Sequence, residues 1–253
     1  MPIDAGPALA TAARLGPYFT WSPWDGGDGW RPLAELRDPG VIAERVAAGR
    51  QTLIRMSGLS GDEIGEREVA SITFLGLASR LLSPLLGAAA VDGVLPVADP
   101  ERLWWRPVDG GPIPIAFRDL TAVAETDELT RTAVRGLVEP ILEVYRARFA
   151  LSPQVLWGNV ASALGGAAGM IADHAPGHAG RAAAIVEQAL ARPPLAGTAT
   201  LERPDPARAR WFLVRNNCCL YYRIPGGGTC GDCVLTPDDV RRRQWQAVLS
   251  PRG

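Results

Sequence analysis

Cysteine is confined to the C-terminal end of this 253-residue sequence. All four cysteines lie in the last 36 residues, at Cys218, Cys219, Cys230 and Cys233. Thiolates are soft metal ligands as well as redox partners. The second pair has the spacing Cys-x-x-Cys around a glycine, and such a turn aims two thiolates at one point. This end of the chain therefore predicts a metal or metal-cluster site.

The adjacent pair restricts what kind of centre can form. Successive side chains of a strand point to opposite faces, so Cys218 and Cys219 can share one ion only if the backbone bends. A two-iron cluster relaxes this demand, because four thiolates are spread over two irons. Three glycines at 226–228 can turn the chain and expose N–H groups to cluster sulfurs, which tunes the potential upward. The spacing favours an iron–sulfur cluster, with zinc and disulfides or inert buried thiols as alternatives.

The compartment bears on this choice. Residues 1–19 have no basic segment, and Asp4 interrupts the apolar stretch, so we expect no signal peptide. Without export the thiols stay reduced, which favours metal binding over disulfides. The apolar stretches 70–91 and 155–171 are broken by Arg80 and Pro84 and by four glycines, respectively. Both are interpreted as buried helices, and no membrane span is predicted.

Composition excludes several classes of protein. The net charge is −1, from 26 arginines and 27 acidic residues, which argues against a nucleic-acid-binding protein. The sequence is 47% hydrophobic and 21% charged, which excludes wholesale disorder. No Gly-x-Gly-x-x-Gly follows a strand pattern and no Gly-x-Ser-x-Gly occurs. A Rossmann oxidoreductase or an α/β hydrolase therefore has no support.

The elements that must position the cysteines are mostly helical. The first 35 residues, rich in glycine, proline and aromatics, are predicted to be irregular and to pack on the core. Asp38-Pro39 and Ser152-Pro153 are helix starts, and Pro140 should kink a helix that buries Leu129, Ala133, Leu137, Ile141, Leu142, Tyr145 and Phe149. Helices are predicted at 38–49, from 62 to 84 or 87, at 126–149, from 152, at 181–192 and from a Thr236 cap to 249. Small residues at 158, 161, 165, 168 and 169 would let another helix approach closely.

Short strands complete the prediction. Residues 103–106 and 113–117 flank an Asp109-Gly110 turn, and Pro112 and Pro114 place the second strand at a sheet edge. Further strands are predicted at 210–215 and 220–224. The proline- and alanine-rich run 193–208 is a predicted seam between a body, 1–205, and a C-terminal module, 206–253. The predicted fold class is α+β, mainly α-helical, with a helical body, small antiparallel strands and a C-terminal iron–sulfur module.

Two segments resemble a known family. Residues 215–223 read Arg-Asn-Asn-Cys-Cys-Leu-Tyr-Tyr-Arg and residues 230–233 read Cys-Gly-Asp-Cys. Together they resemble the C-terminal motif of the FhuF family of siderophore-iron reductases, which carry a [2Fe–2S] cluster on Cys-Cys-x10-Cys-x2-Cys. All four cysteines match. Residues 156–163, Leu-Trp-Gly-Asn-Val-Ala-Ser-Ala, look like a segment of FhuF-like proteins.

The resemblance implies a function and its partners. A [2Fe–2S] cluster held by Cys218, Cys219, Cys230 and Cys233 would reduce Fe(III) in an imported siderophore by one electron. Hydroxamate-like oxygens hold Fe(II) far less tightly than Fe(III), so reduction releases the metal. Residues 1–205 would bind the ferric siderophore, and an unidentified protein would supply the electron. The expected location is cytoplasmic, and peripheral contact with the inner face of the cytoplasmic membrane stays open.

Four further residues are candidates for binding the substrate. Arg215 and Arg223 flank the cluster ligands and could hold an anionic ferric complex, or they could lie in solvent or pair with an acid. Trp157 and Asn159 could contact a ligand or pack in the core. His174 and His178 are interpreted as loop residues because Pro176 and Gly177 lie between them. The alternative functions are a non-enzymatic iron–sulfur electron carrier or redox sensor, and a zinc-stapled binding domain related to siderophore synthesis.

Overall fold

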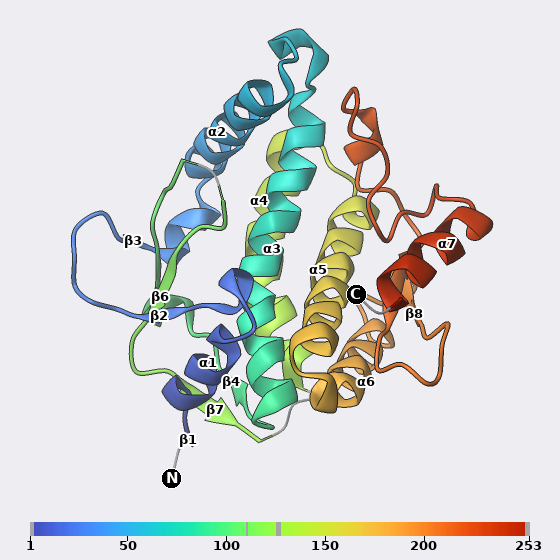
Figure 1. The fold of residues 1–253 in the computed structure, drawn as a ribbon. Coiled ribbons are helices and arrows are strands. Elements are labelled where there is room, and N and C mark those ends of the chain that lie inside the picture. Colours follow the sequence, from blue (N-terminus) through green and yellow to red (C-terminus); the bar gives the residue numbers. More distant parts are fainter. Residues whose placement is uncertain (1–2, 110, 125–127, 251–253) are drawn as a thin grey trace.

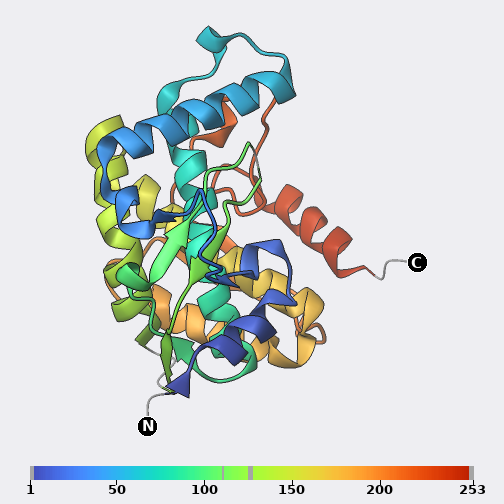
Figure 2. The same cartoon turned by 90° about the vertical axis from the view of Figure 1, so that its left-hand side faces the viewer.

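Two long helices form the centre of the molecule. A computed structural model describes residues 3–109, 111–124 and 128–250. In it, α3 (Glu66–Val91) and α5 (Pro153–His174) lie side by side in the middle (Figure 1). Around them pack α1 (Gly6–Ala13), α2 (Pro39–Ser57), α4 (Glu139–Phe149) and α6 (Ala179–Leu190). The last helix, α7 (Asp238–Leu249), projects from the side of this bundle (Figure 2). The prediction of a mainly helical α+β fold is confirmed.

The two central helices are apolar and are therefore buried in the core. In the described residues, α3 and α5 are the two helices long and apolar enough to cross a membrane by length and composition alone, and 78% and 67% of their most apolar windows lie inside the protein. The prediction that this helix ends at Pro84 or Gly87 is wrong. Both residues are buried within α3, which continues to Val91. A Cβ on Gly87 would lie 2.9 Å from the Phe19 ring and 3.0 Å from the Ala12 Cβ. This glycine lets the N-terminal segment approach α3.

A buried arginine holds that segment in place. Arg80 of α3 is 3% exposed, and its guanidinium donates to the backbone carbonyls of Pro17, Tyr18, Thr20 and Ile113 at 2.6–2.8 Å. Burial lowers its pKa to about 10, which leaves it charged at neutral pH. The residue that interrupts the apolar pattern of α3 is therefore a tie between the helix and the N-terminal loops.

Two predicted helix caps form, and several other helix boundaries differ from the prediction. The Asp38 carboxylate accepts from the Gly40 and Val41 amides at 2.7 and 3.1 Å, and the Ser152 hydroxyl accepts from the Val155 amide at 3.3 Å. Both predicted caps are confirmed. However, α2 continues past residue 49 to the left-handed Gly58, and 61–63 form only a 3-10 turn before α3. Helix α6 begins two residues before its predicted start.

The segment before α4 contains an unusual helix. Residues Thr130–Val138 form a π-helix, and α4 follows with Pro140 in its first turn. The predicted kink at Pro140 corresponds to this change of helix type, because proline has no N–H to donate to a carbonyl of the preceding π-helix. The predicted apolar face is buried in full. The predicted start at Thr126 lies outside the described residues.

The N-terminal 35 residues are more regular than predicted. Helix α1 buries Ala8, Leu9 and Ala12, and α1 packs on α3. The remainder matches the prediction of irregular structure on the core: 3-10 turns at Pro17–Phe19 and Leu33–Arg37, and the two-residue strands β2 (Ser22–Pro23) and β3 (Arg31–Pro32). A three-stranded sheet of order β1-β7-β4 joins Ile3–Asp4, Thr121–Val123 and Leu95–Pro96.

The predicted strand pair forms, although not at an edge. Strands β5 (Leu103–Trp105) and β6 (Ile115–Phe117) are antiparallel, with Trp104 opposite Ala116. The sheet order is β2-β6-β5-β3, so β6 is interior, and its pairing with β2 is parallel. The edge prediction is wrong because Pro112 and Pro114 precede the paired residues and leave their N–H groups free for the ladder. Gly110 of the predicted turn lies outside the described residues.

Glycines of α5 also let a strand approach. Strands β8 (Ala199–Glu202) and β9 (Phe212–Arg215) form an antiparallel pair. A Cβ on Gly165 would lie 2.5 Å from the Leu213 Cδ1, and one on Gly158 would overlap the Asn217 amide. Helix α3 packs closely on α5, as expected, and β9 with the residues after it also lies on α5, against these glycines. The predicted boundary at 205/206 falls between the two paired strands.

Candidate metal centre

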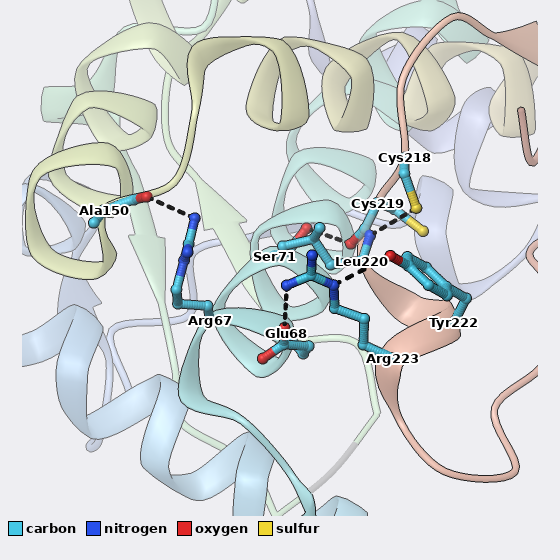
Figure 3. A network of polar contacts seen from close by, with 9 residues as sticks. All are labelled: Arg67, Glu68, Ser71, Ala150, Cys218, Cys219, Leu220, Tyr222 and Arg223. Atoms are coloured by element: carbon cyan, nitrogen blue, oxygen red, sulfur yellow. Dashed lines mark hydrogen bonds and ion pairs between the residues drawn. The ribbon is translucent and has the colours of Figure 1, made fainter.

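The backbone bends directly after the adjacent cysteines. Leu220 has a left-handed conformation with φ +72°, and Tyr221–Arg223 form a 3-10 turn. The predicted strand at 220–224 is therefore wrong, and the chain turns directly after the Cys218-Cys219 pair. The Leu220 amide donates to the Cys218 Sγ at 3.3 Å, as Figure 3 shows. The turn thus orients one of the two thiols with a backbone hydrogen bond.

The second cysteine pair lies in a turn that is tied to the first. The Cys233 amide donates to the Cys230 carbonyl at 3.2 Å, and the Leu235 amide donates to the Cys233 Sγ at 3.4 Å. The Arg215 amide donates to the Asp232 carbonyl at 3.0 Å, so the end of β9 holds this turn. As a result the Sγ atoms of Cys219 and Cys230 lie 3.5 Å apart.

The thiols fit a two-iron cluster better than a single ion. Two thiolates on one tetrahedral ion with metal–sulfur bonds of about 2.3 Å lie about 3.8 Å apart, and the Cys219–Cys230 pair is close to this spacing. All four cysteines are free. Among residues 3–109, 111–124 and 128–250, no three His, Cys, Asp or Glu side chains are grouped so that they could hold one metal ion. A cluster needs pairs of thiolates on two irons, and N–H···S bonds such as those to Cys218 and Cys233 are typical of its surroundings.

The protonation of the metal-free thiols follows from their contacts. A hydrogen bond from Cys230 lowers the pKa of Cys219 to about 6, and the same hydrogen bond raises the pKa of Cys230. Burial raises the pKa of Cys218. Because metal ligands must be deprotonated, loading of this site releases protons.

The site lies at the edge of the protein. Cys219 and Cys233 are each 3% exposed, whereas Cys218 and Cys230 are half-buried. Large apolar side chains stand exposed within three residues of these ligands: Tyr222, Val234 and Leu235. Such a site combines anchored ligands with an outer edge that solvent or a partner can reach.

Helices α3 and α5 support the cysteine loop from below. The Ser71 hydroxyl donates to the Cys219 carbonyl at 2.7 Å (Figure 3). The Asn159 amide donates to the Ser71 carbonyl and hydroxyl at 2.9 and 3.0 Å, and its Oδ1 accepts from the Arg215 Nη2 at 2.8 Å. A continuous chain of hydrogen bonds therefore joins Arg215 to the backbone of Cys219.

The four candidate substrate residues differ in their exposure to solvent. Asn159 is 0% exposed, Arg215 1% and Trp157 9%, and Trp157 belongs to the hydrophobic core. This burial does not favour contact with a dissolved ligand, and their binding of substrate stays a prediction. Arg223 is half-exposed, with its Nη1 3.5 Å from the Glu68 carboxylate and its guanidinium over the Tyr222 ring. Of these four side chains, Arg223 is the one that reaches solvent.

Two contributors were not predicted from the sequence. Ser71 is one hydroxyl in a long apolar helix, and nothing in the pattern marks it. Arg241 of α7 is the second, and its Nη2 donates to the carbonyls of Cys233 and Thr236 at 3.1 and 2.9 Å. Thr236 does not cap α7, because its hydroxyl contacts Thr229 instead.

The histidines take no part in this site. His174 ends α5 and is exposed, and Pro176–His178 form a 3-10 turn. The prediction that His174 is a loop residue is wrong, because it is the last residue of α5, but the two histidines do not share a helix.

Comparison with known proteins identifies the cysteine segment. Residues 215–235 match the FhuF 2Fe-2S C-terminal domain. The matched segment begins at Arg215 and contains all four cysteines, which confirms the resemblance and makes a [2Fe–2S] cluster the cofactor of this domain. No curated protein matches the chain.

Proposed function

We propose that this chain, which carries a FhuF 2Fe-2S domain, reduces Fe(III) held by an imported siderophore and thereby releases Fe(II). The observation that carries the proposal is the arrangement of the four cysteines: two anchored and buried, two half-buried at the surface, inside the matched segment. The [2Fe–2S] cluster supplies single-electron transfer when bound. One electron passes to Fe(III), no covalent bond to the protein forms, and an electron donor protein restores the electron.

The chain's own residues hold, support and expose this centre. Cys218, Cys219, Cys230 and Cys233 bind it, and Ser71 fixes the bend on which two of them lie. No protein acid or base is required, because the siderophore oxygens lose their affinity when the iron becomes softer and less charged. Reduction of the iron is therefore sufficient for its release from the siderophore, and the protein needs no further chemical step.

Arg223 is the substrate contact that the exposure favours. Its guanidinium is half-exposed and follows the bend by three residues, where an anionic ferric complex could pair with it. The apolar side chains of Tyr222, Val234 and Leu235 provide a rim on which the electron donor protein could dock. A cytoplasmic location, where imported ferric siderophores arrive, belongs to the same proposal.

A single-turnover experiment tests the function. The anaerobically reduced protein, freed of excess reductant, is mixed with a ferric hydroxamate in the presence of a ferrous trap. We expect the cluster to reoxidise while one Fe(II) appears per cluster. The gallium hydroxamate has the same shape and charge but accepts no electron, so it should leave the cluster reduced. A cluster that stays reduced with the ferric complex, yet passes electrons to a redox protein, would contradict the reductase and favour the electron carrier.

A further inference from the structure

Arg215 is a buried cation without an acidic partner. Its side chain is 1% exposed, and its Nη2 donates to the Oδ1 atoms of Asn159 and Asn217 at 2.8 and 3.1 Å. Its Nε and Nη1 are buried and have no hydrogen-bond acceptor. No ion pair involves Arg215 in the part of the chain that the structure describes. A charge buried in this way strongly destabilises a protein unless an opposite charge lies nearby.

The two neighbouring arginines differ in this respect. The Arg223 Nη1 lies 3.5 Å from Glu68, and the Arg241 Nη1 lies 2.9 Å from Asp238. Each of these two arginines therefore has a carboxylate partner. For Arg215, no acidic side chain among the described residues provides such a partner.

The cysteine loop surrounds this arginine. Arg215 begins the matched segment, and its own amide donates to the Asp232 carbonyl within the Cys230–Cys233 turn at 3.0 Å. Its guanidinium donates to the Asn217 Oδ1 at 3.1 Å, and Asn217 directly precedes Cys218. Arg215 is thus a buried positive charge that hydrogen bonds join to the segments carrying both cysteine pairs.

We propose that Arg215 is the internal counter-ion of the cluster and raises its reduction potential. A [2Fe–2S] centre on four thiolates is negatively charged in both states and gains one further negative charge when it takes up an electron. A fixed buried cation stabilises the reduced form more than the oxidised one, and low dielectric surroundings strengthen the effect. The inference rests on the cofactor and not on the identity of the substrate.

Asn159 and Ser71 act as positioning residues for this charge. The Asn159 amide group donates to Ser71, which leaves its Oδ1 to accept from Arg215. Ser71 in turn holds the Cys219 carbonyl. The same hydrogen-bond chain therefore fixes both the cation and the cysteine loop, so the separation between them cannot relax when the charge of the cluster changes.

A redox titration of Arg215→Gln, Arg215→Lys and Arg223→Gln tests the proposal. The midpoint potential is read from the EPR signal of the reduced cluster, without siderophore, with iron and sulfide content as the measure of loading. We expect Arg215→Gln to weaken reduction at least tenfold, which is 59 mV for a one-electron couple. Arg215→Lys should restore most of this loss. Arg223→Gln removes an equal but exposed and paired charge, and should change the equilibrium less than twofold.

Other outcomes are equally decisive. A folded, loaded Arg215→Gln protein with the wild-type potential would overturn the proposal. If this variant does not load, Asn159→Asp decides, because a carboxylate against Arg215 neutralises its charge with almost no change of shape. Its potential should fall by at least 59 mV, which is a tenfold weaker reduction, and an unchanged potential would overturn the proposal. Failure of the chain to reduce ferric hydroxamates leaves all these potentials measurable, whereas wild-type protein that holds zinc would overturn both this inference and the cofactor.

Discussion

Leu220 is the residue at which the backbone of the cysteine loop bends. Its left-handed backbone, rare for a residue with a side chain, turns the chain after Cys219 and directs its own amide to the Cys218 Sγ. The need for a bend could be predicted from the alternation of side chains in a strand. Its place could not, because Leu220, Tyr221 and Tyr222 have strand propensity, and tertiary contacts such as the hydrogen bond from Ser71 and the packing of Leu220 on the core override it.

The thiol pair predicts how the stability of the metal-free, reduced protein depends on pH. Because the pKa of Cys219 falls from 9.0 to about 6, the folded chain binds one proton fewer than the unfolded chain between these values, and stability rises with pH. Above about pH 9 the unfolded thiols lose protons that Cys218 and Cys230 retain, since their pKa values are raised, and stability falls.

Urea unfolding between pH 6 and pH 10 measures this dependence. The free energy of unfolding of the wild type, minus that of Cys219→Ser/Cys230→Ser, should be greatest near pH 9. A difference that does not vary with pH would show that the two thiols do not share a proton.

Asn159 makes a second prediction for a single residue. Asn159→Ala leaves the Arg215 Nη2 without its closest acceptor and removes the link to Ser71, so we expect the free energy of unfolding to fall by about 2–3 kcal/mol. Gln154→Ala, an exposed site on the same helix, is the matched control and should have little effect. Equal unfolding free energies for the two variants would mean that the buried network contributes nothing to stability.

At the scale of elements, α5 is the platform for the cysteine segment. Its proline start and apolar composition predicted a buried helix correctly, and its small residues predicted a close neighbour. It could not be predicted that β9 would lie against these glycines, because a row of glycines on a helix accepts a strand as readily as another helix. The side chains of Leu213 and Asn217 occupy the space that Gly165 and Gly158 leave open. The last strand before the cysteines therefore lies where small residues of α5 allow it.

Two neighbouring glycines of α5 provide a matched test. A Cβ at Gly165 would lie 2.5–2.6 Å from Leu213, so Gly165→Ala should displace β9 and lower the free energy of unfolding by about 1–3 kcal/mol. A Cβ at Gly166 would meet nothing within 4 Å, so Gly166→Ala should stabilise the helix by about 0.5–1 kcal/mol. Thermal or urea unfolding of both proteins measures the difference. A Gly165→Ala protein as stable as Gly166→Ala would mean that β9 does not pack as described.

At the scale of the whole molecule, the helical body and the C-terminal segment are joined more closely than their sequences indicate. The pairing of β8 with β9 spans the predicted seam, and Ser71 and Asn159 of the body bind residues of the segment. The sequence predicted the fold class and the [2Fe–2S] domain, because periodicity and cysteine spacing are local properties. It did not predict the network below the cysteines, because those contacts join residues separated by 56 to 148 positions.

The proposed function depends most on a two-iron cluster held by the four cysteines. Visible and EPR spectra of the protein as purified anaerobically and after reduction, with iron and sulfide analysis, test it directly. We expect a coloured protein with two irons and two sulfides per chain, and an EPR signal of one unpaired electron per cluster that appears on reduction. Cys233→Ser should lose or alter this signal. A colourless wild-type protein that contains zinc and no acid-labile sulfide would contradict the account.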